Sequence, residues 1–332
     1  MANVQCFKTR PLERRHNFRK RAFIDIDPSG RIFSMRSLSD IPADVLGWIR
    51  SVFKECNIAA TQKLGNNPNI QEEFLDLSII DKLSSYSAPM RFDSGWLVEL
   101  ETHYIGGLHH YLRWEIADLG IMLFVREAGS AHVRKVVLLQ SKRLYPKHTA
   151  IREFQAVDFE IGMGRLADPE NDRKQLGIRS DFEFDDQCKY RALLVRDQQY
   201  QAIEKYESEK KLSVYYSLYN PPVFPYAKSV PSKVGERFSQ DIALGVRIVR
   251  SKDLHHQIGS KMDNYMPSAA DLLPISESYG WSLQDFIVDH FMQCKEGDAF
   301  RDLSDDRIFN LFNRRSGAIA AAISINIEAP GA

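Results

Sequence analysis

An acid, an amide and a lysine stand near the ends of two short apolar segments of the sequence. Asp118 lies near the beginning of the first segment, 114–125, and Gln140 and Lys142 lie at the end of the second segment, 135–143. Carboxylate and amide oxygens are ligands that hard divalent cations such as Mg²⁺ prefer. Together the three residue types can hold a divalent cation next to a lysine.

Both segments are predicted to be β-strands of one hairpin. They are apolar and rich in β-branched residues, and the polar, glycine-containing stretch 127–130 between them is typical of a turn. Side chains alternate across a strand, so Gln140 and Lys142 project from one face and Ser141 projects from the other. We therefore expect the amide and the lysine to face a common site beside the carboxylate of Asp118.

A further carboxylate is expected at this site because Gln140 offers a cation only a neutral oxygen. Residues 95–105 are predicted to form a short helix, since the capping residues Asp93 and Ser94 precede it and two glycines follow it. Glu101 would lie against the apolar stripe of that helix and is the first choice. Glu115 is the second choice. It has the opposite strand parity to Asp118, so it joins the site only if the strand begins after it or bulges.

A helix with an acid, a strand with Asp118 and a strand ending in Gln140-Ser141-Lys142 resembles the PD-(D/E)xK nuclease superfamily. The similar variant has glutamine in place of the second acid, as in Mrr-like restriction enzymes and effector nucleases of bacterial anti-phage systems. The resemblance covers roughly residues 93–145. It implies an α/β (α+β) fold with a restriction-endonuclease-like mixed β-sheet core flanked by helices.

The resemblance also implies a Mg²⁺- or Mn²⁺-dependent endonuclease that acts on DNA in antiviral defence. Asp118, Gln140 and Glu101 would be the metal ligands, and Lys142 would orient the attacking water or stabilise negative charge on the phosphate. The physical logic agrees, because a cation bound by oxygen atoms makes water nucleophilic near neutral pH. The candidate catalytic residues are Asp118, Gln140, Lys142, Glu101 and Glu115.

Each of these residues also has a structural explanation. Asp118 can cap a turn, Gln140 and Lys142 can protect the edge of a sheet, and Glu101 can pair with Arg113. A decayed nuclease would keep the same hydrophobic pattern, so the second hypothesis is a catalytically inactive subunit that binds nucleic acid or scaffolds a defence complex. Unrelated enzyme chemistry lacks support, because the sequence has no P-loop, dinucleotide-binding or α/β-hydrolase motif.

A basic segment near the N-terminus is a separate candidate for contact with nucleic acid. Residues 8–21 are dense in lysine and arginine with aromatic residues interleaved, a pattern that fits contact with phosphates and equally fits a solvated arm. The predicted contacts with nucleic acid are Arg14, Arg15, Arg19, Lys20, Arg21 and, at the end of the second strand, Arg143.

Composition predicts a soluble, cytoplasmic protein. The chain has 332 residues and is 44% hydrophobic, which is enough to bury a sizeable core. Its 44 basic and 44 acidic residues balance, so any binding of nucleic acid must come from local patches. The four cysteines lie far apart, and no segment has the length or composition of a membrane span or secretory signal.

Three parts are predicted along the chain. They are an N-terminal accessory segment with the basic arm (1–90), a nuclease core with insertions (91–295) and a strand-containing C-terminal extension packed on the core (296–332). The expected partners are double-stranded DNA and an ATPase or helicase on another chain, or a second copy of the protein. No membrane partner is expected.

Hydrophobic spacing and turn residues place the other elements. Helices are predicted at 42–55, 70–83, 187–211 and 282–294, a small hairpin at 22–33, and strands at 212–219, 242–249 and 323–327. A helix that returns the chain to strand 212–219 beside the main hairpin fits a mixed sheet.

Overall fold

The computed structural model describes residues 25–26, 32–33, 41–104, 116–126, 133–152, 178–230, 242–272, 280–300, 302, 304–312 and 319–332. The chain forms two compact units, Met1–Asp40 and Ile41–Ala332. In the first unit, β1 (Asp25–Ile26) pairs antiparallel with β2 (Ile32–Phe33), in agreement with the small hairpin predicted at residues 22–33. The division falls at residue 40 and not near residue 90, so the helices that follow it belong to the unit that contains the sheet.

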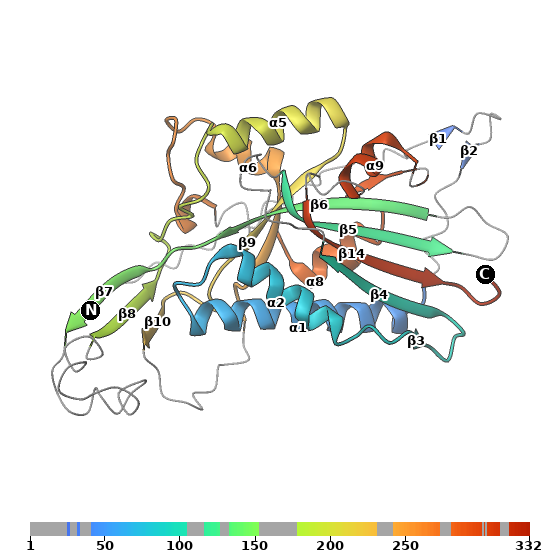
Figure 1. The fold of residues 1–332 in the computed structure, drawn as a ribbon, viewed down its shortest axis with the longest axis horizontal. Coiled ribbons are helices and arrows are strands. Elements are labelled where there is room, and N and C mark those ends of the chain that lie inside the picture. Colours follow the sequence, from blue (N-terminus) through green and yellow to red (C-terminus); the bar gives the residue numbers. More distant parts are fainter. Residues whose placement is uncertain are drawn as a thin grey trace, which may run out of the picture. The chain divides into compact units, whose positions relative to one another are not determined.

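A mixed sheet, nine-stranded within the described residues, forms the centre of the second unit (Figure 1). The strands lie in the order β12 (Trp281–Ser282), β11 (Val246–Arg250), β9 (Val214–Tyr219), β6 (Val133–Arg143), β5 (Ala117–Arg126), β14 (Ile319–Glu328), β4 (Leu97–Tyr104) and β3 (Met90–Arg91), and β13 (Asp298–Ala299) pairs with β6. The predicted mixed-sheet core flanked by helices is confirmed.

The predicted main hairpin is present in this sheet. β5 and β6 run antiparallel with Leu119 opposite Leu139, and β6 runs parallel to β9 with Gln140 opposite Tyr216. All of β9 and most of β6 are buried. Helices cover both faces of these strands, which explains why their sequences are nearly continuous apolar segments.

Residues 97–104 form strand β4, so the helix predicted for residues 95–105 is wrong. Val98 and Leu100 are buried, whereas Glu101 is exposed, which is the period-two pattern of a strand. The apolar residues of this segment fit both a helical stripe and a strand face. Pairing with β14 along the whole strand decides in favour of the strand.

The C-terminal strand β14 lies inside the sheet. It is antiparallel to β4 on one side and parallel to β5 on the other. Its alternating residues Ile323, Ile325 and Ile327 are buried, in agreement with the predicted strand. Residues 296–332 therefore contribute a central strand of the core and are not an extension packed against it.

Helices pack on both faces of the sheet. α1 (Ala43–Asn66) and α2 (Glu72–Ser84) pack together, and α2 contacts β4, β5 and β6. The opposite face meets α5 (Gln198–Lys210) and α6 (Ser251–Ile258). Two contacts of β9 show that these helices lie on opposite faces. The hydroxyl of Tyr219 contacts Asp76 of α2, and the hydroxyl of Tyr216 contacts His255 of α6. Tyr216 and Tyr219 are three residues apart, so their side chains project from opposite faces of the strand.

Two predicted helices differ in detail. Of the helix predicted at 187–211, only α5 is helical. Asp197 caps the N-terminus of α5, since its side chain accepts a hydrogen bond from the Tyr200 N–H at 2.8 Å, and the helix begins there. The helix predicted at 282–294 consists of α8 (Leu283–Asp285), followed by a π-helix, η4 (Phe286–Phe291). A short helix, α9 (Asp306–Phe312), packs against β14.

A second, three-stranded sheet follows β6. It contains β7 (Lys147–Arg152), β8 (Ile178–Phe184) and β10 (Tyr226–Val230), with β8 in the middle. β10 begins directly after Pro225. Among the helices of the described residues, none is long and apolar enough to cross a membrane.

Candidate functional site

Asp118 and Gln140 meet where β5 begins and β6 nears its end. The Gln140 Nε2 donates a hydrogen bond to Asp118 Oδ2 at 2.6 Å, and the Ser141 backbone N–H donates to the same oxygen at 2.6 Å. The antiparallel register places the two side chains beside each other on one face of the sheet. The acid and the amide thus lie together, as strand parity predicted.

The side-chain oxygen of Gln140 lacks a hydrogen-bond partner in the described part of the chain. The residue is only 2% exposed. A buried oxygen without a partner is costly, and such atoms in native proteins commonly contact a water molecule or an ion. A half-turn of the amide would direct this oxygen toward Asp118. Gln140 therefore has an unused ligand atom next to a carboxylate.

Lys142 lies next to an acid that comes from helix α2. Its Nζ is 4.0 Å from Glu72 Oε2, and its side chain is 5% exposed. Glu72 Oε1 accepts the Arg143 backbone N–H at 2.9 Å. Burial raises the pKa of Glu72, whereas the positive charge of Lys142 opposes that rise. Glu72 is thus the carboxylate that the structure places beside the lysine.

A second carboxylate of α2, that of Asp76, contacts Ser141 of β6. Asp76 is buried, and its Oδ1 accepts hydrogen bonds from the hydroxyl of Ser141, at 2.6 Å, and from the hydroxyl of Tyr219. Burial, and then the negative charge of Asp118, hold the pKa of Asp76 well above its usual range. Ser141 therefore links two acids, with its N–H bonded to Asp118 and its hydroxyl bonded to Asp76.

Glu101, the predicted third ligand, does not join this group. It lies on β4 opposite Ser324 of β14, and Ser324 lies opposite Met122 of β5. Glu101 is therefore separated from β5 by a whole strand and is level with Met122, not with Asp118. Its carboxylate accepts the Ser324 hydroxyl at 3.0 Å instead. The error follows from the wrong helix prediction for this segment.

The remaining predicted residues are either outside the described part or differently placed. Arg143 is 5% exposed, and its Nη1 donates to the carbonyl oxygen of Pro68 at 2.7 Å. It therefore braces the turn before α2 and is not an exposed contact for nucleic acid. Outside the described residues lie Glu115, Arg14, Arg15, Arg19, Lys20 and Arg21.

Glu72 and Asp76 were not identified from the sequence, although a signal was present. The two acids are four residues apart in the helix predicted at 70–83, so they share one face. That face continues through the buried Ile79 and Leu83. Acids in line with an apolar stripe are unusual, since burying a charge is costly without a partner.

The group offers only oxygen ligands to a metal ion. No set of three His, Cys, Asp or Glu side chains among the described residues is close enough to hold a metal. A cation at Asp118 would therefore also need the neutral oxygen of Gln140 and water molecules. That donor set fits Mg²⁺ or Mn²⁺, which accept oxygen ligands and retain water.

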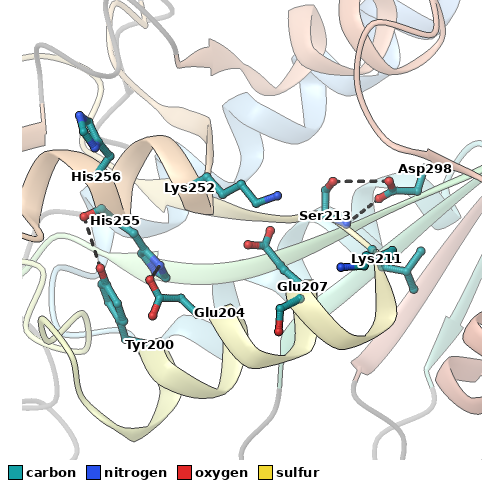
Figure 2. Close-up of a pocket in the computed structure, with 11 residues that line it drawn as sticks. Tyr200, Glu204, Glu207, Lys211, Ser213, Lys252, His255, His256 and Asp298 are labelled. Atoms are coloured by element: carbon teal, nitrogen blue, oxygen red, sulfur yellow. Dashed lines mark hydrogen bonds and ion pairs between the residues drawn. The ribbon is translucent and has the colours of Figure 1, made fainter. Parts of the chain in front are cut away.

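A groove between α5 and α6 is a separate feature (Figure 2). It has a volume of about 650 Å³, with Ser213 and Asp298 at one end and Tyr200 and His255 at the other. His255 Nε2 is 2.9 Å from the hydroxyl of Tyr216, and burial lowers the pKa of His255 to about 3. None of the predicted site residues lines this groove.

Two carboxylates of the groove have structural partners. Glu207 Oε1 accepts the Val214 backbone N–H at 2.9 Å and the Ser251 hydroxyl at 2.7 Å. Asp298 accepts the Ser213 backbone N–H at 2.6 Å. Glu207 and Asp298 thus accept hydrogen bonds from backbone N–H groups at the start of β9 and have a structural role there. We therefore do not assign a catalytic role to these two acids.

Comparison with known proteins gives no relative: no family description, no curated protein and no solved structure matches the chain. The functional assignment therefore depends on the geometry around Asp118.

Proposed function

We propose that the protein is a metal-dependent nuclease that hydrolyses phosphodiester bonds in DNA. The observation that supports this function is the presence of two pairs near the end of β6, Asp118 with Gln140 and Lys142 with Glu72. This arrangement repeats the order helix acid, strand acid and glutamine–lysine strand of the PD-(D/E)xK nucleases. A role as effector of a prokaryotic anti-phage system follows from that resemblance alone.

The carboxylate of Asp118 and the side-chain oxygen of Gln140 would hold the metal ion, and Glu72 of α2 lies beside Lys142. Mg²⁺ or Mn²⁺ would supply a Lewis acid and an activated water molecule. Gln140 contributes no charge, so this site carries less negative charge than one with a second acid on the strand. That composition reduces the repulsion of a phosphate from the site.

Lys142 would act on the reacting phosphate. Its ammonium group can donate a hydrogen bond to a non-bridging phosphate oxygen and stabilise the charge that develops there. Glu72 holds this ammonium near the strand end. Ser141 positions the neighbouring side chains, because its hydroxyl is fixed by Asp76 and its N–H is bonded to Asp118.

Cleavage of supercoiled plasmid DNA in Mg²⁺ or Mn²⁺ tests this proposal. We expect Asp118→Ala and Lys142→Ala to lower the cleavage rate by about a hundredfold or more, as loss of a group that stabilises the transition state usually does. Glu72→Gln should also reduce the rate. Glu101→Ala is the matched control and should cleave like the wild type. Equal cleavage by all of these variants would refute the assigned site.

A second function has one specific observation in its favour. Asp118 Oδ2 already accepts two hydrogen bonds, and Lys142 has a carboxylate neighbour, so both charged groups of the site have partners inside the protein. Such a network suits a catalytically inactive nuclease fold that binds nucleic acid. DNA binding that survives Lys142→Ala, without metal-dependent cleavage, would favour this alternative.

A further inference from the structure

A cluster of cations surrounds Tyr145, three residues after Lys142. We call Arg143, Tyr145, Lys189 and Arg191 the Tyr145 cluster. The Tyr145 N–H donates to the carbonyl oxygen of Lys189 at 2.9 Å, and the two residues form an antiparallel bridge. Residues directly opposite each other in such a pair project to the same side. Arg143 and Arg191 are each two residues from the bridge and share that side.

Two guanidinium groups converge on the ring of Tyr145. The Arg143 Cζ is 3.7 Å from the ring centroid, and the Arg191 Cζ is 5.3 Å from it. Burial lowers the pKa of Arg143, and the charge of Arg191 acts in the same direction. Two positive groups are therefore held close enough to repel each other, with the aromatic ring as their shared support.

Arg143 also has unused hydrogen-bonding capacity. The residue is 5% exposed, and its Nε lacks a hydrogen-bond partner within the described part of the chain. An unpaired buried donor on a cation is costly. An anion beside the exposed Arg191 would reduce the repulsion between the two arginines.

The exposed Arg191 and the half-buried Lys189 carry charge without an acid paired to them in the described part of the chain. Within the described residues, Arg191 and Lys189 form no ion pair, and Lys189 lies over the ring of Tyr265 at 5.3 Å. Other cations of the same region behave differently, since Arg196 pairs with Asp263 and Lys261 pairs with Asp271. Lys189 and Arg191 thus present positive charge that no ion pair neutralises within the described residues, whereas Arg143 has Glu72 as a neighbour.

We propose that the Tyr145 cluster binds backbone phosphates of a DNA duplex. Arg191 and Lys189 would contact the phosphates, while the ring of Tyr145 supports the Arg191 guanidinium. The choice of DNA rests on the proposed function, because Arg143 and Tyr145 of the cluster directly follow Lys142 along the chain and Lys189 pairs with Tyr145. A strand held here would pass the end of β6, where the phosphodiester would be cleaved.

Binding of a short fluorescein-labelled DNA duplex, followed by anisotropy in EDTA, tests this inference without cleavage. The binding constant is measured between about 50 and 200 mM salt. Each phosphate contact contributes about 0.9 to the slope of log K against log salt. Arg191→Ala should lower that slope by about 0.9, and the double variant Lys189→Ala/Arg191→Ala should lower it by about 1.8.

Two variants act as controls. Arg191→Lys keeps the charge and should retain most of the slope, which separates a phosphate contact from loss of packing. Lys54→Ala removes an exposed lysine on α1, away from the cluster in the sequence, and should leave the slope unchanged. Thermal unfolding shows whether each variant is folded.

An unchanged slope in a folded double variant would overturn the inference, and so would absence of duplex binding by the wild type. A lowered slope supports it, even if plasmid cleavage fails in Mg²⁺ and Mn²⁺; that result would refute only the proposed nuclease. Cleavage with an unchanged slope would leave the nuclease intact and would exclude this surface.

Discussion

Substitution of Asp76 tests the network behind the candidate site. Asp76 is fully enclosed by α2 and the ends of β6 and β9, and it is the shared acceptor for the hydroxyls of Ser141 and Tyr219. In Asp76→Ala both hydroxyl donors lose their partner inside the protein. Each unpaired buried donor costs about 1 to 3 kcal/mol, so the free energy of unfolding should fall by about 2 to 6 kcal/mol.

Asp76→Asn separates the hydrogen bonds from the charge. The amide oxygen can still accept both hydrogen bonds, so this variant should be far more stable than Asp76→Ala. Because burial raises the pKa of Asp76, the folded state binds its proton more tightly than the unfolded state does. The stabilisation from this proton is full below the usual pKa of about 3.8 and is lost as the pH rises through the raised value.

Urea unfolding of the wild type and both variants, followed by tryptophan fluorescence across a pH series, measures these effects. The stability of the wild type relative to Asp76→Asn should decrease as the pH rises. Asp81→Asn, an exposed change on the same helix, should show no such trend. A cost below about 1 kcal/mol for Asp76→Ala would refute the role given to its hydrogen bonds.

Three further outcomes are expected. Burial lowers the pKa of His255 from 6.5 to about 3, so its contribution to stability is full above about pH 6.5 and is lost as the pH falls toward 3; His255→Gln should flatten this part of the urea-unfolding profile. Glu207→Ala leaves two buried donors unpaired and should cost about 2 to 6 kcal/mol, whereas exposed Glu209→Ala should change stability by no more than about 0.5 kcal/mol. Calorimetric titration should detect Mn²⁺ binding to the wild type and its loss in Asp118→Ala; equal binding by both would place the metal elsewhere.

The strands that carry the site could be predicted because their signal is local. β5 and β6 are short apolar segments separated by polar residues, and a strand buried on both faces requires little more than that. Strand parity then placed Gln140 beside Asp118 without knowledge of the rest of the chain. The hydrogen bond between these two side chains agrees with that placement.

The third acid could not be chosen in this way. The residues around Glu101 fit a helix and a strand equally well, and a strand that begins more than two hundred residues later along the sequence, β14, decides between them. The hydrogen-bonded partner supplies the free energy that selects the strand, and nothing near Glu101 in the sequence reveals that partner.

The sequence by itself determined the mixed α/β class, the two strands of the hairpin and the common face of Asp118 and Gln140. Each depends on alternation or hydrophobicity within a few residues. Only the tertiary structure decided that Glu72 and Asp76 of α2 meet the end of β6, that Arg143 is buried and that the C-terminal strand lies inside the sheet. These features depend on contacts between segments far apart in the sequence, where packing overrides local preference.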